Sequence, residues 1–420
     1  MRLRRHTAAR ALSAVAVACM AAVLAVLAPA AGASAAEVPL SVTDQAVADR
    51  LATRSLAPNL GKDLAGVVTD AATGQVIWAH TPAEAQIPAS NAKILTAVNA
   101  LEAFGPTHTF TTSVMTGSTA RRIVLVGGGD PSLSARQLGR MARSTAAAWL
   151  AKGVTRVRVE VDDSLFPAPT PALGWKRTYT IEDVSPVRAL VVDHHRRWDT
   201  SLDAGTVFAR KLERWGLDVR RVARAVRPAT STVVTESHGL DLATQIANML
   251  KTSDNDVAEG LHRLVALQTG FPATWAGAQA AQAAALTRLG VPLTAGLYDG
   301  SGLSRRDRLS PATLVGVLGK VFDGQHPNLL GLQQGSFAVA GVSGTLAPHY
   351  LRYVTNPTRC AAGLIQAKTG SLTGVISLTG FARGADGQVK LFSFLLNQVP
   401  STLTTRRAVD RLAATVTGCW

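Results

Sequence analysis

The spacing of apolar and polar positions predicts the elements of the first quarter of the chain. Two short apolar runs, residues 67–70 and 76–79, flank a turn that contains a glycine, which is the pattern of a β-hairpin. After Ser90, apolar side chains recur at helical spacing, at Ile94, Leu95, Val98 and Leu101. Glycine and proline at 105–106 end this pattern. We therefore predict a hairpin followed by a helix that begins near Ser90.

Strand and helix patterns alternate in the stretch between residues 107 and 236. Residues 122–126 are an apolar run typical of a strand, residues 135–152 have helical periodicity, and residues 157–161 alternate between apolar and charged side chains. Three prolines then mark an irregular loop, at Pro167, Pro169 and Pro171. Turn residues bound the stretch on both sides. We expect residues 107–236 to form a separate inserted α+β domain.

The C-terminal part predicts helices and then a sheet. Residues 241–250 and 256–267 have helical periodicity on either side of a short polar loop. Three apolar runs joined by glycine-rich turns predict an antiparallel meander, at residues 364–369, 375–382 and 389–396. A last helix is expected over residues 404–416. We predict a mixed α/β fold whose main domain, residues 37–106 and 237–420, is an antiparallel sheet flanked by helices.

Residues 1–36 have the features of a secretory signal peptide. Arginines precede an apolar run over residues 11–31, and an A-x-A pattern follows at Ala33 to Ala35. Cleavage after Ala35 or Ala36 is the expectation, and a retained membrane anchor is the alternative. Both predict an exported protein in the extracellular, cell-wall or periplasmic space, either released or associated with the membrane.

Composition and charge narrow the class of protein. Hydrophobic residues make up 47% of the 420 residues and charged residues 17%, which is typical of a globular protein. Removing the leader takes away four arginines and no acid, so the formal charge falls from +15 to +11. The arginines are scattered and no basic run is interleaved with aromatic residues, so nucleic acid is not an expected partner. An anionic polymer outside the membrane is a better match for this charge.

Cysteine usage predicts one disulfide. Cys19 lies in the leader, which leaves Cys360 and Cys419 as an even pair in an oxidising compartment. We expect this bridge to hold the last helix near the strand that leads to Lys368.

An S-x-x-K sequence, Ser90-Asn91-Ala92-Lys93, lies at the predicted start of a helix. A separation of three places the Ser90 hydroxyl and the Lys93 amine on one face, where the amine can take the hydroxyl proton. The helix N-terminus favours negative charge that develops beside the hydroxyl. The ordinary alternative is a serine that caps a helix.

Two further tripeptides can complete a site of this chemistry. In Ser253-Asp254-Asn255, between two predicted helices, a second hydroxyl can relay a proton and an amide can hold a substrate carbonyl. In Lys368-Thr369-Gly370, at the end of a predicted strand, the edge can pair with an extended peptide and the glycine can let it approach. Taken singly, these have ordinary explanations as a helix cap and a solvated strand end.

The three motifs occur together in the order found in penicillin-binding proteins and class A β-lactamases. The chain resembles the class C low-molecular-mass penicillin-binding proteins, the D-alanyl-D-alanine carboxypeptidase/endopeptidase family, over nearly its whole mature length. Further matching segments are PASNAK at 88–93, GDP at 129–131, DGSGLSR at 299–305 and GTL at 344–346. The resemblance implies a penicillin-binding/β-lactamase-like transpeptidase fold. Ser253 follows Ser90 by 163 residues, which is short for this family, so one inserted subdomain is expected to be reduced or missing.

The resemblance also implies an enzyme and the reaction that it catalyses. It would be a serine-type D-Ala-D-Ala carboxypeptidase, with endopeptidase action left open, whose substrates are peptidoglycan stem peptides and whose inhibitors are β-lactams. Ser90 would attack the carbonyl between the two D-alanines, Lys93 would act as the base, and Ser253 would pass the proton to the leaving amine.

Substrate binding is assigned to the other motif residues in the same way. Lys368 would hold Ser253 and the substrate end in a positive field, and its charge together with burial would lower the pKa of Lys93. Asn255 would hold a substrate carbonyl, and the hydroxyls of Thr369 and Ser371 would meet the carboxylate. The backbone N–H groups of Ser90 and Ser371 would form the oxyanion hole.

Arg305 is a candidate for substrate selection. The resemblance implies that the DGSGLSR segment borders the active-site cleft, and a guanidinium suits a carboxylate. We hypothesise that Arg305 binds the free carboxylate of a diaminopimelate side chain, and the alternative is an exposed loop arginine.

Two other functions, and the binding of a dinucleotide or a metal, have less support in the sequence than a carboxypeptidase. A β-lactamase is not favoured because no E-x-x-L-N sequence is present to position a deacylating water, and a catalytically silent wall-binding homologue has no need of four intact site residues. The glycine-rich stretch at 126–131 fails the dinucleotide fingerprint. His194 and His195 are adjacent and would point to opposite faces of a strand, so we expect surface histidines and no metal. No cofactor is expected, and the sequence does not specify an oligomeric state.

Overall fold

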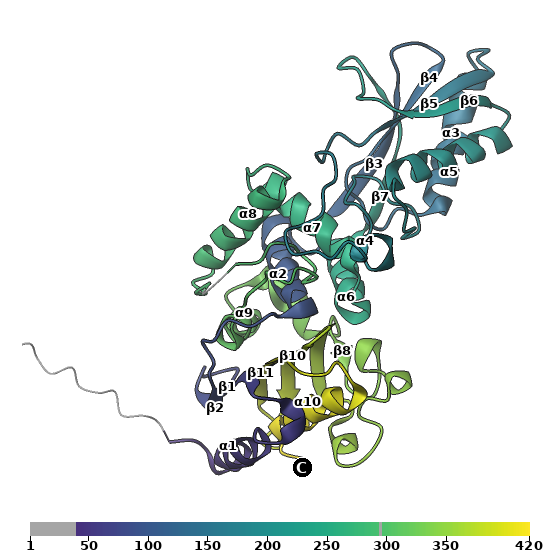
Figure 1. The fold of residues 1–420 in the computed structure, drawn as a ribbon. Helices are drawn as coiled ribbons and strands as arrows, with labels where there is room; N and C mark the ends of the chain where they lie inside the picture. The colour runs from purple at the N-terminus through teal and green to yellow at the C-terminus, as the bar shows by residue number, and fades with distance from the viewer. Residues whose placement is uncertain (1–38, 294–295) are drawn as a thin grey trace, which may run out of the picture. The chain divides into compact units, whose positions relative to one another are not determined.

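A computed structural model describes residues 39–293 and 296–420 of the chain. The expected signal peptide and Cys19 lie outside these residues. The described strands form two sheets, one of six strands and one of five (Figure 1).

The six-stranded sheet has the order β2-β1-β11-β10-β9-β8, and every neighbouring pair is antiparallel. Its strands are β1 (Asp63–Asp70), β2 (Val76–His80), β8 (Ala338–Val339), β9 (Ile365–Leu372), β10 (Val375–Arg383) and β11 (Val389–Asn397). The predicted hairpin is β1 with β2, and the predicted meander is β9 to β11. Both predictions are confirmed.

Both faces of this sheet are covered by helices. The helices that pack on it are α1 (Val42–Arg54) and α10 (Leu403–Val416) on one face and α2 (Ala92–Phe104) and α9 (Pro311–Phe322) on the other. Side chains of β11 alternate between these two layers: Phe392 and Phe394 pack with α1 and α10, and Leu391 and Leu395 pack with α2 and α9. A strand buried on both faces is mainly apolar, and β11 is so apart from Lys390, Ser393 and Asn397.

Helix α2 lies at the centre of the helical layer. Its first ten residues are buried, and it contacts α9 and three other helices: α6 (Leu242–Thr252), α7 (Asn255–Gln268) and α8 (Trp275–Arg288). Such a helix is mainly apolar, and the buried residues of α2 are so apart from Lys93, Thr96 and Asn99. The element after Ser90 is therefore rigidly held.

The five-stranded sheet has the order β6-β5-β4-β3-β7. Its elements are β3 (Thr109–Thr116), β4 (Arg122–Val126), α3 (Ala135–Leu150), β5 (Arg156–Asp162), the irregular turn α4 (Tyr179–Glu182), α5 (Thr200–Arg214), β6 (Asp218–Arg224) and β7 (Val233–Asp241). Strands β4, β5 and β6 are parallel, and β3 is antiparallel to β4 and β7. Helices α3 and α5 pack on one face, through side chains such as Trp149 and Phe208 (Figure 1).

The second sheet extends past the expected boundary of the inserted domain at residue 236. Strand β7 continues to Asp241, and that residue accepts a hydrogen bond from the backbone N–H of Thr244 and so caps α6 directly. Because strand and helix share this residue, the turn at 237–239 is part of the strand. The division into two domains stays a prediction.

A disulfide joins Cys360 to Cys419, 59 residues apart, as predicted. Cys360 lies in a short 3₁₀ helix, Thr358–Ala361, before β9, and Cys419 follows α10. The bridge therefore holds the end of the chain beside the segment that leads to Lys368.

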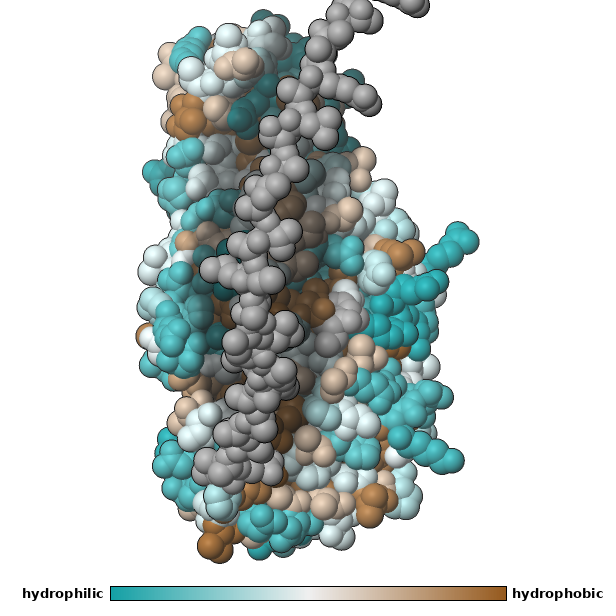
Figure 2. All heavy atoms as spheres, turned by 90° about the vertical axis from the view of Figure 1, so that its left-hand side faces the viewer, coloured by the Kyte–Doolittle hydropathy of each residue, from teal (hydrophilic) through white to brown (hydrophobic). Residues whose placement is uncertain are grey.

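The described residues include no helix that is both long enough and apolar enough to span a bilayer. On the visible part of the face in Figure 2, hydrophilic and apolar residues are intermixed.

Candidate active site

The Ser90 hydroxyl lies in a short 3₁₀ turn that precedes α2. The turn η2 spans Ala89–Asn91, and α2 begins at Ala92. Asn91 occupies the capping position of α2 and its side chain makes no capping hydrogen bond. Ser90 is therefore not a helix cap. Its Oγ lies 3.1 Å from Nζ of Lys93 instead.

The turn is held by the neighbouring sheet and loop. Ala89 has a left-handed backbone, with φ of +47°, which a non-glycine residue adopts only when its surroundings enforce it. Ser377 Oγ, on β10, donates to the Pro88 carbonyl oxygen at 2.7 Å. Gly302 packs so closely that a Cβ there would lie 1.9 Å from the Ala89 carbonyl oxygen. These contacts fix the backbone that carries Ser90.

Lys93 is fully buried, and its amine is surrounded by acceptors. Nζ lies 2.6 Å from Asn255 Oδ1 and 2.7 Å from the Ser301 carbonyl oxygen, in addition to Ser90 Oγ at 3.1 Å. The first two oxygens can only accept. A neutral amine therefore gives its two protons to them and directs its lone pair to the Ser90 hydroxyl.

Burial lowers the pKa of Lys93 to about 8, because the charged amine loses its hydration. The charges of Glu259 and Asp299 oppose this shift. Burial, one of the two expected causes, is thus the main cause of the lowered pKa, and the charge of Lys368 is not among the largest. The pKa of Lys368 is itself well below its usual range, through burial first and then the charge of Lys93.

The Ser253-Asp254-Asn255 motif forms the loop between α6 and α7. Ser253 has a left-handed backbone, with φ of +64° and ψ of +38°. Asp254 caps α7 by accepting a backbone N–H of its first turn at 3.0 Å, so neither Ser253 nor Asn255 is the cap. Asn255 instead bridges two segments, because its Oδ1 accepts from Lys93 and its Nδ2 donates to the Asp183 carbonyl oxygen at 2.9 Å.

The Lys368-Thr369-Gly370 motif lies inside β9 and not at a strand end as expected, because the strand continues to Leu372. Lys368 is fully buried, which excludes a solvated strand end. Its Nζ donates to the Thr369 carbonyl oxygen at 2.8 Å, and its expected action on Ser253 and the substrate through a positive field stays a prediction. Thr369 Oγ1 donates to Thr345 Oγ1, in the GTL segment, at 2.8 Å.

Strand β9 has a free edge beside this motif. Strand β10 pairs with β9 from Ile365 to Leu372, whereas β8 pairs only with Gln366 and Ala367. Within the described chain, the backbone after Ala367 therefore has no strand partner on the β8 side. Ser371 is exposed there. An extended peptide can pair with such an edge.

The glycine at 370 is required by packing, and the expected approach of substrate to its backbone stays a prediction. A Cβ there would lie 2.1 Å from Ser377 Oγ and 2.9 Å from the Pro88 carbonyl oxygen. Strand β9 therefore lies directly against the turn that carries Ser90. Only a residue without a side chain leaves room for this contact.

The DGSGLSR segment supplies the Ser301 carbonyl and is held by buried acids. Glu259 accepts hydrogen bonds from the backbone N–H groups of Gly300 and Ser301 at 2.9 and 2.8 Å, and Asp299 accepts from the Trp175 indole at 2.6 Å. Burial, and then the charge of Asp299, raises the pKa of Glu259 to about 8. The sequence gives no indication of this role for Glu259, since glutamates in helices are ordinarily exposed.

Arg305 lies beside the turn that follows β9. Its Nη1 donates to the Thr373 carbonyl oxygen at 2.9 Å, and its charge opposes the burial that raises the pKa of the Tyr179 hydroxyl. It is half-buried, so it is not an unattached loop arginine. The guanidinium thus contacts the turn after β9, while the Arg305 backbone N–H donates to the Gly174 carbonyl oxygen at 3.2 Å.

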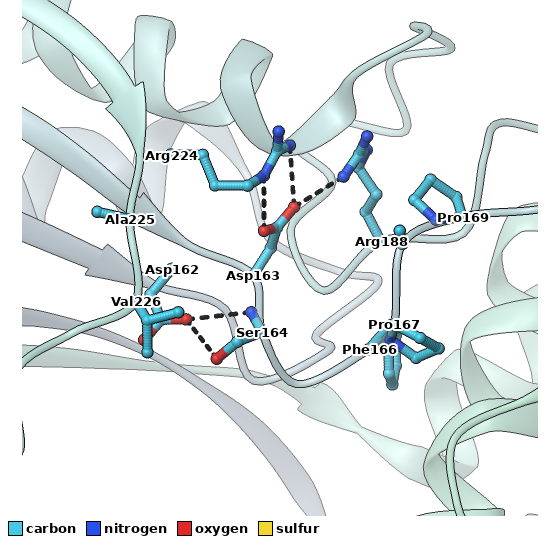
Figure 3. Close-up of a pocket in the computed structure, with 11 residues that line it drawn as sticks. Asp162, Asp163, Ser164, Phe166, Pro167, Pro169, Arg188, Arg224, Ala225 and Val226 are labelled. Carbon is cyan, nitrogen blue, oxygen red and sulfur yellow. Dashed lines mark hydrogen bonds and ion pairs between the residues drawn. The ribbon is translucent and has the colours of Figure 1, made fainter.

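A separate cavity of about 290 Å³ lies at the carboxyl ends of β5 and β6 (Figure 3). Arg188 and Arg224 converge there on Asp163, and Arg224 also pairs with Asp199. These charged groups pair with one another, so the cavity provides no free nucleophile or base. We assign it no part in the chemistry.

His194 and His195 bind different carboxylates. His194 Nδ1 lies 3.2 Å from Asp254 Oδ2, and His195 Nδ1 lies 2.8 Å from Asp203 Oδ2. Across residues 39–293 and 296–420, no three His, Cys, Asp or Glu side chains are grouped so that they could hold a metal ion.

The sheet with its flanking helices, and the serine and lysine that meet beneath a free strand edge, are those of a serine peptidase of the penicillin-recognising class. The chain belongs to the D-Ala-D-Ala carboxypeptidase 3 (S13) family, whose model matches residues 47–198 and 176–416. It is therefore a hydrolase, and the expected family is confirmed.

Several relatives match most of the chain. It is 34% identical to a carboxypeptidase of Mycobacterium tuberculosis over 384 residues, which are 86% of this chain and 81% of that protein. It is 28% identical to a D-alanyl-D-alanine carboxypeptidase of Actinomadura sp., over 82% and 79% of the two chains. Penicillin binding protein 4 of Haemophilus influenzae has the same fold, with a TM-score of 0.74 at 21% identity over 88% of this chain and 98% of that one. The predicted fold class is confirmed.

Proposed function

We propose that this chain is a serine-type D-Ala-D-Ala carboxypeptidase that cleaves peptidoglycan stem peptides through an acyl-enzyme on Ser90. The observation that carries the proposal is the 3.1 Å contact between Ser90 Oγ and Lys93 Nζ. The other two neighbours of this amine, Asn255 Oδ1 and the Ser301 carbonyl oxygen, can only accept hydrogen bonds. Membership of the S13 family and the named reaction of the Actinomadura relative support the same chemistry.

Acylation begins with proton transfer from Ser90 to neutral Lys93. The Ser90 oxygen attacks the carbonyl carbon between the two D-alanines, and the carbonyl π electrons move to its oxygen. Backbone N–H groups of Ser90 and Ser371 stabilise this oxyanion. The C–N bond then breaks as the proton passes by way of Ser253 to the leaving amine, so D-alanine departs and an ester remains on Ser90.

Hydrolysis of the ester completes the cycle. A water molecule attacks the ester carbonyl, one of its protons goes to the Lys93 amine, and the C–O bond to Ser90 breaks. The proton on Lys93 then returns to the Ser90 oxygen, which restores both groups and releases the shortened peptide.

The free edge of β9 provides the place for the peptide. The stem peptide would pair with the backbone of this strand, while Asn255 holds a substrate carbonyl. The terminal carboxylate would meet the hydroxyls of Thr369 and Ser371 and the amine of Lys368. The exposure of Ser371 supports this orientation.

Recognition of diaminopimelate by Arg305 is part of the proposal. Only one guanidinium nitrogen is used on the Thr373 carbonyl, and arginine has five donors. The side chain can therefore bind a carboxylate without giving up that contact. Its place beside the end of β9 supports a role at the substrate and not elsewhere.

The proposed location is outside the cytoplasmic membrane, where the substrate occurs. The leader pattern in the sequence and the disulfide between Cys360 and Cys419 support export. The basic charge supports attraction to anionic wall polymers.

Labelling with a fluorescent penicillin tests the function. The Haemophilus influenzae protein has been solved with a β-lactam, and a Dictyostelium relative is named a penicillin-sensitive carboxypeptidase. We expect a stable label on the native chain and none on Ser90→Ala, whose thermal unfolding should be unchanged. Rapid release of the label would indicate a β-lactamase, and absence of any label on the native chain would indicate a silent wall-binding protein.

A further inference from the structure

Residues 183–196 contact three polar residues at the start of α7, which are Asp254, Asn255 and Asp256. In addition to the bond from Asn255 to the Asp183 carbonyl, the Ser185 backbone N–H donates to Asp256 Oδ1 at 2.6 Å, and Arg196 Nε lies 3.5 Å from Asp256 Oδ2. The fourth contact is the 3.2 Å ion pair between His194 and Asp254. Residues 253–256, the catalytic loop, are thus held by a segment more than fifty residues upstream.

His194 reaches Asp254 from a bent backbone. Asp193 and His194 both have left-handed conformations, with φ of +49° and +52°. The bend is anchored to the start of α3, because the Asp193 N–H donates to the Leu133 carbonyl oxygen at 2.9 Å and its carboxylate accepts from the Ala135 N–H at 3.2 Å. Two such residues in succession persist only where neighbouring contacts enforce them.

The partner of this histidine lies between two residues of the proposed mechanism. Asp254 is flanked by Ser253, whose backbone is left-handed, and by Asn255, which accepts from Lys93 at 2.6 Å. A hold on Asp254 therefore fixes the positions of both neighbours. We propose that His194 is a positioning residue, which in its charged form holds Asp254 and so keeps Ser253 and Asn255 in the arrangement that acylation requires.

The groups around His194 favour its charged form. Its pKa is raised, first by the hydrogen bond to Asp254 and then by the charges of Asp254, Asp256 and Asp193, while burial opposes them. Asp130 also interacts electrostatically with His194, and its own pKa is raised by burial. Because the pKa of His194 is higher in the folded chain, the ion pair is complete below the ordinary pKa of histidine. It is lost as the pH rises through the raised value.

The pH dependence of penicillin acylation tests this inference, which rests on the proposed function. The second-order rate of acylation would be measured for the native chain and for His194→Gln from about pH 6 to about pH 9. Both proteins contain Lys93, so the ratio of the two rates at each pH removes the pH dependence that the ionisation of Lys93 causes. We expect the native chain to be about three- to fivefold faster near pH 6, the range for a partly exposed ion pair, and the ratio to approach one near pH 9.

Two variants separate positioning from a general structural effect. His194→Lys, which keeps a charge at all these pH values, should restore most of the rate. His195→Gln removes the neighbouring histidine, whose partner is Asp203 and not the catalytic loop, and should leave the ratio at one. A ratio that does not vary with pH, no loss in His194→Gln, or an equal loss in His195→Gln would overturn the inference. A native chain that takes no label would instead overturn the proposed function.

Discussion

Three acceptors around one amine determine which protonation state of Lys93 can act. In the charged form of Lys93, Nζ donates to Ser90, Asn255 and Ser301 at once and cannot take the serine proton. Burial lowers the pKa to about 8, so about a tenth of the molecules have the neutral amine at pH 7.

The rate of penicillin acylation should accordingly rise with pH and level off above about pH 8, because deprotonation of Lys93 creates the active form. Lys93→Met should lower the rate by a factor of about one hundred or more, the usual contribution of a positioned base. Stopped-flow measurement of acylation across this pH range checks both statements. A variant that retained the same pH profile would show that another group takes the proton.

Arg305→Ala should lower kcat/KM for stem peptides that contain diaminopimelate by about tenfold, the usual loss with a charge-assisted hydrogen bond, and spare lysine-containing analogues. The comparison matters because Arg305 also donates to the Thr373 carbonyl at the end of β9. Loss of that contact alone would slow both peptides equally. Steady-state kinetics on the pair of peptides distinguishes these outcomes, and equal effects on both would exclude selection by Arg305.

At the scale of single residues, the sequence indicates which side chains are functional but not which backbone atoms are. Ser90 and Lys93 are recognisable because their spacing on a helix has a chemical meaning. The Ser301 carbonyl has no such mark, because every residue has one. Glu259 is missed for another reason: a glutamate at the fifth position of a helix has the appearance of a surface residue, and only the fold shows that it is buried.

At the scale of elements, the position of the turn that carries Ser90 depends on its contact with β9. Gly370→Ala would place a methyl group 2.9 Å from the Pro88 carbonyl oxygen, which is backbone and cannot move aside freely. We expect the free energy of unfolding to fall by roughly 1–3 kcal/mol, as for other overpacked sites, and acylation to slow because the turn shifts. Denaturant unfolding and penicillin labelling measure the two effects.

Gly319→Ala is the matched control for this change. Gly319 lies inside α9, and nothing is within 4 Å of the position of its added Cβ. Alanine there should leave labelling unchanged and raise stability by about 0.5–1 kcal/mol, since it favours the helix. If both variants lost labelling to the same extent, the close approach at Gly370 would not be the cause.

Elements are predictable where apolar and polar residues contrast. The strand at Arg122–Val126 and the helices α6 and α7 lie within two residues of their expected bounds. Helix α8 is not revealed in this way, because its alanines provide little contrast between faces. The expectation that Lys368 ends a strand is wrong because the apolar run stops there while the backbone ladder continues to Leu372.

The whole molecule depends on contacts that no local pattern reveals. The order β6-β5-β4-β3-β7 and the contacts between residues 183–196 and the loop at 253–256 join segments far apart in the chain. The spacing of apolar residues predicts which face of an element is buried but not which other element packs against it. The family resemblance provides the general fold, whereas the specific hold on the catalytic loop is visible only in three dimensions.

The disulfide between Cys360 and Cys419 is the long-range contact that the cysteine count does predict. It closes 59 residues that include β9, β10, β11 and α10, so it restricts the unfolded chain over half of the six-stranded sheet. In the chain-entropy model a loop of this length stabilises the fold by about 4 kcal/mol, and measured values are often lower. The doubly substituted Cys360→Ala, Cys419→Ala chain should therefore unfold at lower denaturant concentration.

Penicillin labelling of this variant should stay at the native level below its unfolding transition, because the hydrogen bonds of Cys360 and Cys419 go to Pro357 and Thr417 and not to the site. Reducing the native chain should lower its stability to that of the variant, whereas the same reductant should leave the variant unchanged. Alkylation without reductant provides the direct check: neither Cys360 nor Cys419 should react in the exported protein. Two reactive thiols under these conditions, or equal stability of the two chains, would show that the bridge does not form.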